Sequence, residues 1–241
     1  MKQLVARYFH VMSCTLAKMK PIDKILNTSD KHAVKLAAEL LSSGEVIALP
    51  TDTIYGLACS ANNEEAIKRL YKIKERNLEK PIAICVSDYG DFQRWAQAKH
   101  LPNELISKLL PGAVTIVLRK SSHLNNPYLN PGLDKIGIRI PDFDFIRDIC
   151  REFKSPIALT SANSSSEKSS LNIQEFKHLW PQISAIFDGG NLSDLDSHRA
   201  GSTVVDLSKK NICKIIRPGI SADNTLSILK QYNIEVESKE N

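Results

Sequence analysis

Apolar residues along the chain follow two alternating spacings, one typical of helices and the other typical of buried strands. Between residues 30 and 43 they recur at intervals of three and four, and Asp30 and Gly44 stand where a helix would begin and end. The apolar run at 45–50 that follows predicts a buried strand. The same alternation predicts further helices at 64–74, 90–98, 102–109, 142–152 and 222–231, and further strands at 81–86, 113–118, 137–140, 156–160, 185–188, 203–207 and 212–216.

Strands interleaved with helices predict an α/β protein with a twisted, open, mixed and largely parallel sheet flanked by helices. No linker rich in Pro, Gly or Ser divides the chain, and the sequence has no internal repeat. We therefore expect a single domain over 26–235, preceded by a basic segment at 1–25 and followed by a tail at 236–241. No apolar run approaches the roughly 18 residues that a membrane-spanning helix needs, so we expect no membrane span.

Positive charge is concentrated at the start of the chain. The 241 residues include 32 basic and 27 acidic side chains, which gives a net charge of +5. Four basic residues and no acidic residue lie within 1–22, so the remainder is nearly neutral, unlike a dedicated nucleic-acid-binding domain. The basic start resembles a mitochondrial presequence, and a disordered basic tail is the alternative. The first interpretation places the protein in mitochondria as well as in the cytoplasm.

Cysteine and histidine spacing gives no sign of a metal site. The five cysteines are an odd number, lie far apart and form no C-x-x-C pair, which argues against both a disulfide framework and a zinc site. The six histidines are scattered and form no H-E-x-x-H pattern. We therefore predict reduced thiols and no protein-bound metal.

Four unusual polar segments lie at the ends of predicted strands. They are PTDTIYG (50–56), KIKERNLEKP (72–81), TSANSSS (160–166) and GSTVVD (201–206), and Arg139 and Arg217 also stand at strand ends. Each segment by itself is equally explained as a turn or a helix cap. In open α/β sheets, however, ligands bind beyond the carboxyl ends of strands, so the coincidence favours a binding site.

The absence of the common phosphate-binding loops narrows the chemistry of this site. The sequence has no G-x-x-x-x-G-K-[ST], no G-x-G-x-x-G and no G-x-S-x-G. A phosphate would then be held by Lys and Arg side chains together with Ser and Asn groups. The candidates of this kind are Lys74, Arg76, Lys80, Ser161, Asn163 and Arg217.

At these positions the sequence closely resembles the YrdC family, the threonylcarbamoyl-AMP synthases. The matching strings, in order, are PTDTIYGLA, K-x-R-x-x-x-KP, LLPGAVTIVL, GIRIPD, ALTSAN, DGG, GSTVVDL and IIRPG. The similarity runs from about residue 30 to 231, and the segment before DGG looks particularly like the animal members. The resemblance implies a YrdC-like fold.

The resemblance also implies an activity. Enzymes of this family are nucleotidyltransferases that convert L-threonine, bicarbonate and ATP into threonylcarbamoyl-adenylate and pyrophosphate. ATP is then a co-substrate, and Mg²⁺ is its expected companion. A separate transferase complex delivers the threonylcarbamoyl group to an adenosine beside the anticodon of certain tRNAs, so tRNA is an indirect partner.

Residue roles follow from the same resemblance, position by position. Lys74 and Arg76 would be catalytic. ATP would be bound by Arg76, Lys80, Asn163 and Arg217, and threonine by Thr53, Arg139, Ser161 and Ser202. Two positions depart from the family pattern: Cys85 stands where many relatives carry His, and Ser166 stands where Gly is common. We assign neither of them a catalytic role.

The alternative function is an RNA-binding or ribosome-maturation protein that uses the same concave basic cleft. The nearly neutral body argues against this alternative. A steep salt dependence of RNA affinity would support it, because each phosphate contact releases counterions.

Replacing Arg76 with Ala tests the catalytic assignment within the K-x-R string. We expect Arg76→Ala to slow adenylate formation about 100-fold or more, by analogy with the loss of one preorganised charge-stabilising group. Pyrophosphate release by the purified variant measures the effect, with thermal unfolding as the check on folding. Near-normal turnover by a folded variant would remove Arg76 from the mechanism.

Overall fold

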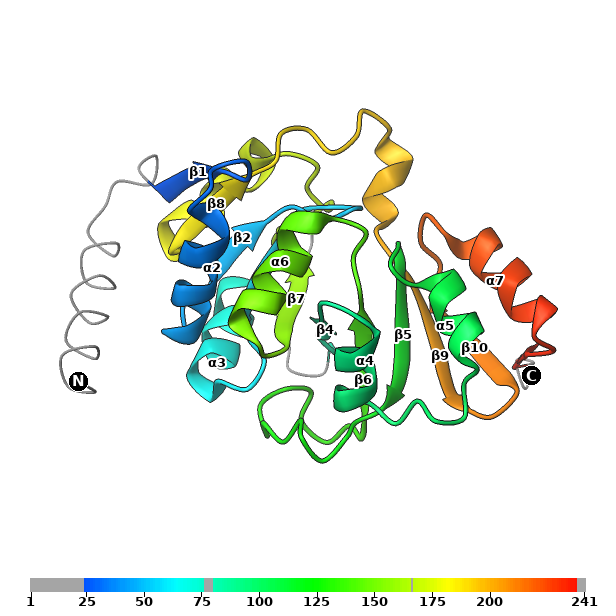
Figure 1. Cartoon of the computed structure of the whole chain (residues 1–241). Coiled ribbons are helices and arrows are strands. Elements are labelled where there is room, and N and C mark those ends of the chain that lie inside the picture. Colours follow the sequence, from blue (N-terminus) through cyan, green and yellow to red (C-terminus); the bar gives the residue numbers. More distant parts are fainter. Residues whose placement is uncertain (1–23, 76–79, 166, 238–241) are drawn as a thin grey trace.

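A computed structural model describes residues 24–75, 80–165 and 167–237 (Figure 1). The basic segment predicted at 1–25 thus lies almost wholly outside the described residues, as do Arg76, Ser166 and the end of the predicted tail. The strands are β1 (Ile25–Asn27), β2 (Ile47–Leu49), β3 (Gly56–Ser60), β4 (Ala83–Cys85), β5 (Val114–Arg119), β6 (Lys135–Arg139), β7 (Ile157–Ser161), β8 (Ala185–Asp188), β9 (Thr203–Lys209), β10 (Ile212–Arg217) and β11 (Glu235–Val236). The helices are α2 (Ala33–Ser42), α3 (Glu64–Ile73), α4 (Tyr89–Trp95), α5 (Asn103–Leu109), α6 (Asp144–Phe153) and α7 (Ala222–Gln231), with 3₁₀ helices η2 (Ile173–Gln182) and η3 (Asp196–Ala200).

The strands form one open sheet in the order β1-β8-β2-β3-β7-β4-β6-β5-β9-β10-β11. Five neighbouring pairs are parallel: β1/β8, β2/β8, β4/β6, β5/β9 and β10/β11. The other five are antiparallel: β2/β3, β3/β7, β4/β7, β5/β6 and β9/β10. The open mixed sheet is therefore as predicted, but it is not largely parallel. Connections without a crossover helix, such as the one between β2 and β3, reverse the chain direction.

Strand β3 accounts for part of that difference, because the sequence pattern did not predict it. Its five residues are all buried, so it lacks the apolar–polar alternation that identifies a half-exposed strand. Gly56 opens the strand against β7, and a Cβ there would lie 2.5 Å from Leu159 Cδ1. The close β3/β7 pairing therefore depends on a residue type that sequence reasoning associates with turns. The short strands β1 and β11 and the two 3₁₀ helices also went unpredicted.

The two faces of the sheet are covered differently. On one face, side chains such as Leu57, Ile84 and Ile138 are buried together with apolar residues of α3, α4 and α5. On the other face, Ile47 and Ile157 are buried with α2 and α6, which lie side by side in Figure 1. Helices α2 and α6 cover only part of this second face, and a cleft opens on the part that they leave uncovered. Among the described residues, no helix is long and apolar enough to cross a membrane.

The turn after β10 packs directly on the start of β9. A Cβ on Gly219 would lie 2.3 Å from the carbonyl carbon of Ser202 and 2.4 Å from the backbone nitrogen of Thr203. The neighbouring Ile220 N–H donates to the Gly201 carbonyl at 3.0 Å. The absence of a side chain at Gly219 thus allows the R-P-G turn to hold Ser202 in place.

Substitution of Gly219 by Ala tests this close approach. Backbone atoms cannot move aside cheaply, so we expect Gly219→Ala to destabilise the fold by about 1–3 kcal/mol and to lower Tm by several degrees. Thermal unfolding measures the effect, with Gly90→Ala as the control, since the nearest atom to a Cβ there is a side-chain oxygen at 3.3 Å. Equal Tm values for the two variants would contradict the argument.

Candidate functional site

A cleft of about 570 Å³ opens on the face of the sheet that α2 and α6 leave uncovered. Its floor is built from alternate residues of neighbouring strands, because every second side chain of a strand points to the same face. Strand β6 contributes Lys135, Gly137 and Arg139 to this floor. The middle of the floor has no side chain at Gly137. A Cβ there would lie only 2.9 Å from Thr115 Cγ2, so the neighbouring strand packs closely against this position.

Arg139 forms one end of the cleft and is only 5% exposed. Its Nη2 donates to Thr53 Oγ1 at 3.0 Å and pairs with the carboxylate of Asp52. Its Nε is buried and has no hydrogen-bond partner among the described residues. A buried donor without a partner costs free energy, so this end of the cleft favours a ligand with an anionic acceptor.

The P-T-D-T turn that carries Asp52 and Thr53 is organised by Thr51. Thr51 Oγ1 accepts the N–H groups of Thr53 at 3.1 Å and Ile54 at 3.2 Å and donates to the Ile54 carbonyl at 2.7 Å. The threonine hydroxyl thereby satisfies the backbone of the turn between β2 and β3. The turn presents both side chains to Arg139.

Hydroxyl groups and a second arginine line the facing wall. Arg217, at the end of β10, donates from Nη2 to the Ser202 carbonyl at 2.8 Å. Ser202 Oγ lies 2.8 Å from Thr115 Oγ1. The structure therefore brings four of the predicted site residues, Arg139, Ser161, Ser202 and Arg217, to one cleft.

Lys74 and Asn163 lie behind the cleft and hold the T-S-A-N loop together. Lys74 is 1% exposed, and its Nζ donates to the Ser161 carbonyl at 2.7 Å, to Asn163 Oδ1 at 3.1 Å and to the Asn163 carbonyl. Asn163 Nδ2 donates to the carbonyls of Ser164 and Glu167. Of the other predicted cations, Lys80 is exposed beside Pro81, which lines the cleft, and Arg76 lies outside the described residues.

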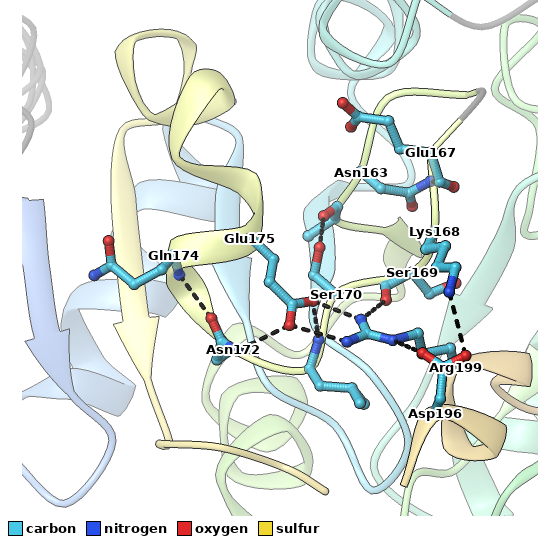
Figure 2. A network of polar contacts seen from close by, with 12 residues as sticks. Asn163, Glu167, Lys168, Ser169, Ser170, Asn172, Gln174, Glu175, Asp196 and Arg199 are labelled. Atoms are coloured by element: carbon cyan, nitrogen blue, oxygen red, sulfur yellow. Dashed lines mark hydrogen bonds and ion pairs between the residues drawn. The ribbon is translucent and has the colours of Figure 1, made fainter. Parts of the chain in front are cut away.

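The loop beyond Asn163 is fastened by an arginine that sequence reasoning missed (Figure 2). Arg199 binds both carboxylate oxygens of Glu175, at 2.6 and 3.1 Å, and donates to Asp196 at 2.7 Å and to the Ser169 carbonyl at 2.7 Å. The next residue, Ser170, donates to the Ala162 carbonyl within the same loop. Arg199 thus connects the loop after β7 to the segment that leads into Ser202.

Cys85 lines the cleft beside Arg139 but is a poor nucleophile. Burial raises the pKa of its thiol to about 12, against a smaller lowering effect of the Arg139 charge. The thiol is therefore protonated at neutral pH. This state agrees with leaving Cys85 without a catalytic role.

Comparison with known proteins identifies the family. The Sua5/YciO/YrdC family model, described as telomere recombination, matches residues 39–219. A Bos taurus protein named threonylcarbamoyl-AMP synthase is 47% identical over 205 residues, which cover 84% of this chain and 74% of the relative. The Homo sapiens protein of the same name is 46% identical over 83% of this chain and 72% of its own length. This chain belongs to the Sua5/YciO/YrdC family.

Solved structures of the family share the fold. Pyrococcus abyssi Sua5 complexed with L-threonine superposes with a TM-score of 0.73 at 28% identity, covering 85% of this chain and 58% of the Sua5 chain. Escherichia coli YciO superposes with a TM-score of 0.71 at 22% identity over 81% of this chain and 93% of its own, which shows a common fold alone. This chain therefore spans less than two thirds of the Sua5 chain.

Sequence reasoning found the residues at strand ends and missed those that support them. Asp52 lies within the PTDTIYG motif, but nothing in the sequence shows that it pairs with Arg139. Thr115 and Lys135 could have been found from the alternation along their strands, since each lies on the same face as a predicted site residue. Arg199 and Glu175 leave no such signal, because they lie in 3₁₀ helices 24 positions apart.

The Arg199–Glu175 pair predicts a pH-dependent contribution to stability. Hydrogen bonds from Arg199 are the main cause that lowers the pKa of Glu175 below its ordinary value of 4.5. A carboxyl with a lowered pKa stabilises the fold above its ordinary pKa, and this stabilisation is lost as pH falls through the lowered value.

We expect Glu175→Gln to lower the free energy of unfolding by about 1 kcal/mol at neutral pH, and the difference from the wild type to shrink below pH 4.5. Urea unfolding at neutral and acidic pH measures it. Glu65→Gln is the control, since the Glu65–Lys68 pair is much more exposed. A difference that grows in acid would contradict the assignment.

Proposed function

We propose that this chain is a threonylcarbamoyl-AMP synthase, an ATP-dependent nucleotidyltransferase that forms threonylcarbamoyl-adenylate and pyrophosphate from L-threonine, bicarbonate and ATP. One observation carries the proposal: motifs far apart in the chain, which is 46–47% identical to proteins of that name, meet around a single cleft. The cleft offers a buried arginine, hydroxyl groups and a second arginine, the donor set that a small carboxylic acid and a phosphate ester need.

Threonine binds at the Arg139 end of the cleft in this proposal. The guanidinium takes the α-carboxylate, because its buried Nε has no partner among the described residues and a carboxylate accepts from such a fork in a fixed orientation. Thr53 holds Arg139 from the side through its hydroxyl. Ser161 and Ser202 supply hydroxyl groups to the remaining polar atoms of the substrate.

ATP lies toward the second arginine. The threonine ammonium group first loses a proton, and the amine then reacts with bicarbonate to form a carbamate and water. An oxygen of this carbamate attacks the α-phosphorus, the bond to the bridging oxygen breaks, and pyrophosphate leaves. Negative charge accumulates on phosphate oxygens, so the protein contributes positioned cations, for which we propose Arg76, Lys80 and Arg217. Lys74 and Asn163 act from behind the cleft. They fix the T-S-A-N loop through hydrogen bonds, and this role does not require direct contact with phosphate.

Mg²⁺ is expected to reach the cleft bound to ATP. Among the described residues there is no group of three or more His, Cys, Asp or Glu side chains that could hold a metal ion. Mg²⁺ would be bound by the ATP phosphates as part of the substrate.

The product is a mixed anhydride and therefore a reactive acyl donor. A transferase complex that delivers the threonylcarbamoyl group to an adenosine beside the tRNA anticodon would consume it, so tRNA remains an indirect partner. We propose a cytoplasmic and mitochondrial location from the basic segment at 1–25. The RNA-binding alternative is less well supported, since Arg139 and Lys135 in the cleft are each paired with an aspartate.

Pyrophosphate release tests the proposed function. The purified protein with ATP, Mg²⁺ and bicarbonate should release pyrophosphate when L-threonine is added, and omission of bicarbonate should abolish the release. Arg139→Met should lower kcat/KM for threonine about 30-fold or more, because a buried charge contact is lost. Arg119→Met is the control, since Arg119 is exposed and pairs with Asp134. Threonine-independent release, or none from folded protein, would contradict the proposal.

A further inference from the structure

Asp52 is a carboxylate at the amino-acid end of the cleft to which the reaction above gives no role. Its side chain is 11% exposed and that of Arg139 is 6% exposed, so the ion pair between them is largely withdrawn from water. Among the described residues, Arg139 is the hydrogen-bond and ion-pair partner of the Asp52 carboxylate, and it reaches one oxygen, Oδ1. Asp52 is not itself among the residues that line the cleft, but it is adjacent to Thr51 and paired with Arg139, both of which line it. The other oxygen, Oδ2, thus has acceptor capacity to spare.

Arg139 likewise has hydrogen-bonding capacity to spare. Both of its contacts, to Asp52 and to Thr53 Oγ1, are made through Nη2. Its buried Nε is left without a partner among the described residues. The pair therefore has an unused donor, the N–H at Nε of Arg139, and an unused acceptor, Oδ2 of Asp52, among the described residues.

A carboxylate alone would fit this pair poorly. Bound to Arg139 it would lie near the negative charge of Asp52, and two like charges at short range in a partly buried site repel each other. An amino-acid zwitterion removes this conflict, because its ammonium group stands next to its carboxylate and offers three N–H donors. The charge pattern of the pair is thus complementary to that of an α-amino acid.

We propose that, before the substrate nitrogen is carboxylated, Asp52 binds the α-ammonium group of the incoming amino acid while Arg139 binds its α-carboxylate. This inference rests on the proposed function, which places the amino acid at the Arg139 end. Asp52 then selects for the ammonium group of the substrate, and Arg139 selects for its carboxylate. Thr51 fixes the backbone on the C-terminal side of Asp52 by accepting the N–H groups of Thr53 and Ile54.

The other charged pair of the cleft does not offer the same fit. Lys135 and Asp206 lie 2.8 Å apart at the start of β6, four residues from Arg139, which is roughly 13 Å along a strand. Burial opposes ionisation of Asp206, but hydrogen bonds from Lys135 and Ser208 outweigh it and keep its pKa below the ordinary value. Its acceptors are thus already used, and one amino acid cannot span both pairs.

Binding measurements with two ligands separate this role from a purely structural one. The first ligand is L-threonine, and the second is its hydroxy-acid analogue, in which a hydroxyl replaces the α-ammonium group. Titration calorimetry without ATP gives Kd for each. We expect the wild type to prefer L-threonine at least about 10-fold, the loss that one charged hydrogen bond predicts, and Asp52→Asn to remove that preference by weakening L-threonine alone.

Asp142→Asn is the matched control, because Asp142 also pairs with an arginine, Arg147, but is 69% exposed. Thermal unfolding verifies that each variant is folded, and Asp52→Ser replaces Asp52→Asn if the latter does not fold. A retained preference in the folded variant overturns the proposal. So does an equal loss of both ligands, since Asp52 would then only position Arg139.

The same titrations distinguish the failure of this inference from the failure of the proposed function. If the wild-type protein does not bind L-threonine, the amino-acid site itself is wrong and the inference falls with it. If the wild type binds L-threonine and the Asp52 variants keep the preference for it, only the role of Asp52 is wrong.

Discussion

The ammonium group of Lys74 is buried at the end of α3, and oxygen atoms of Ser161 and Asn163 surround it. Burying a charge is costly unless hydrogen bonds replace the lost water, and here they do. The contacts tie a helix on one face of the sheet to the end of β7 and to the loop beyond it. In return, Ser165 Oγ donates to the Lys74 carbonyl, so the loop and the end of the helix hold each other. Removal of the Lys74 ammonium group would leave buried oxygen acceptors without their donor.

The cleft depends on this anchor and on three others of the same kind. Thr51 shapes the turn between β2 and β3, Gly219 lets the R-P-G turn lie on Ser202, and Arg199 fastens the loop after β7. Each anchor acts at a connection and not inside a strand. The strands supply a rigid floor, and the anchors position the polar groups above it. Binding residues on loops are held accurately in this way although loops are the least constrained part of a fold.

Two cations of the cleft are paired with aspartates, and this arrangement bears on function. Arg139 faces Asp52 at one end and Lys135 faces Asp206 at the other. A surface built for a nucleic-acid backbone carries unpaired cations, whereas paired charges suit a small ligand that bears both signs. The family relationship and the pairing therefore point in the same direction. The Cys85 thiol beside Arg139, protonated because burial raises its pKa, adds volume to this site and no charge.

The sequence by itself determined the α/β class, most helices and strands, and the residues at strand ends that meet in the cleft, because hydrophobic spacing and motif order are local properties of a chain. The tertiary structure decided what is not local. It inserted β3, whose buried residues show no alternation, and so added two of the five antiparallel strand pairs. It showed that Lys74 and Asn163, which the sequence assigned to the nucleotide site, also hold a loop together. It also placed Asp52 against Arg139, 87 positions away, and Arg199 against Glu175. Pairing between charged groups far apart in the chain depends on how the backbone brings them together, and no spacing along the sequence encodes that distance.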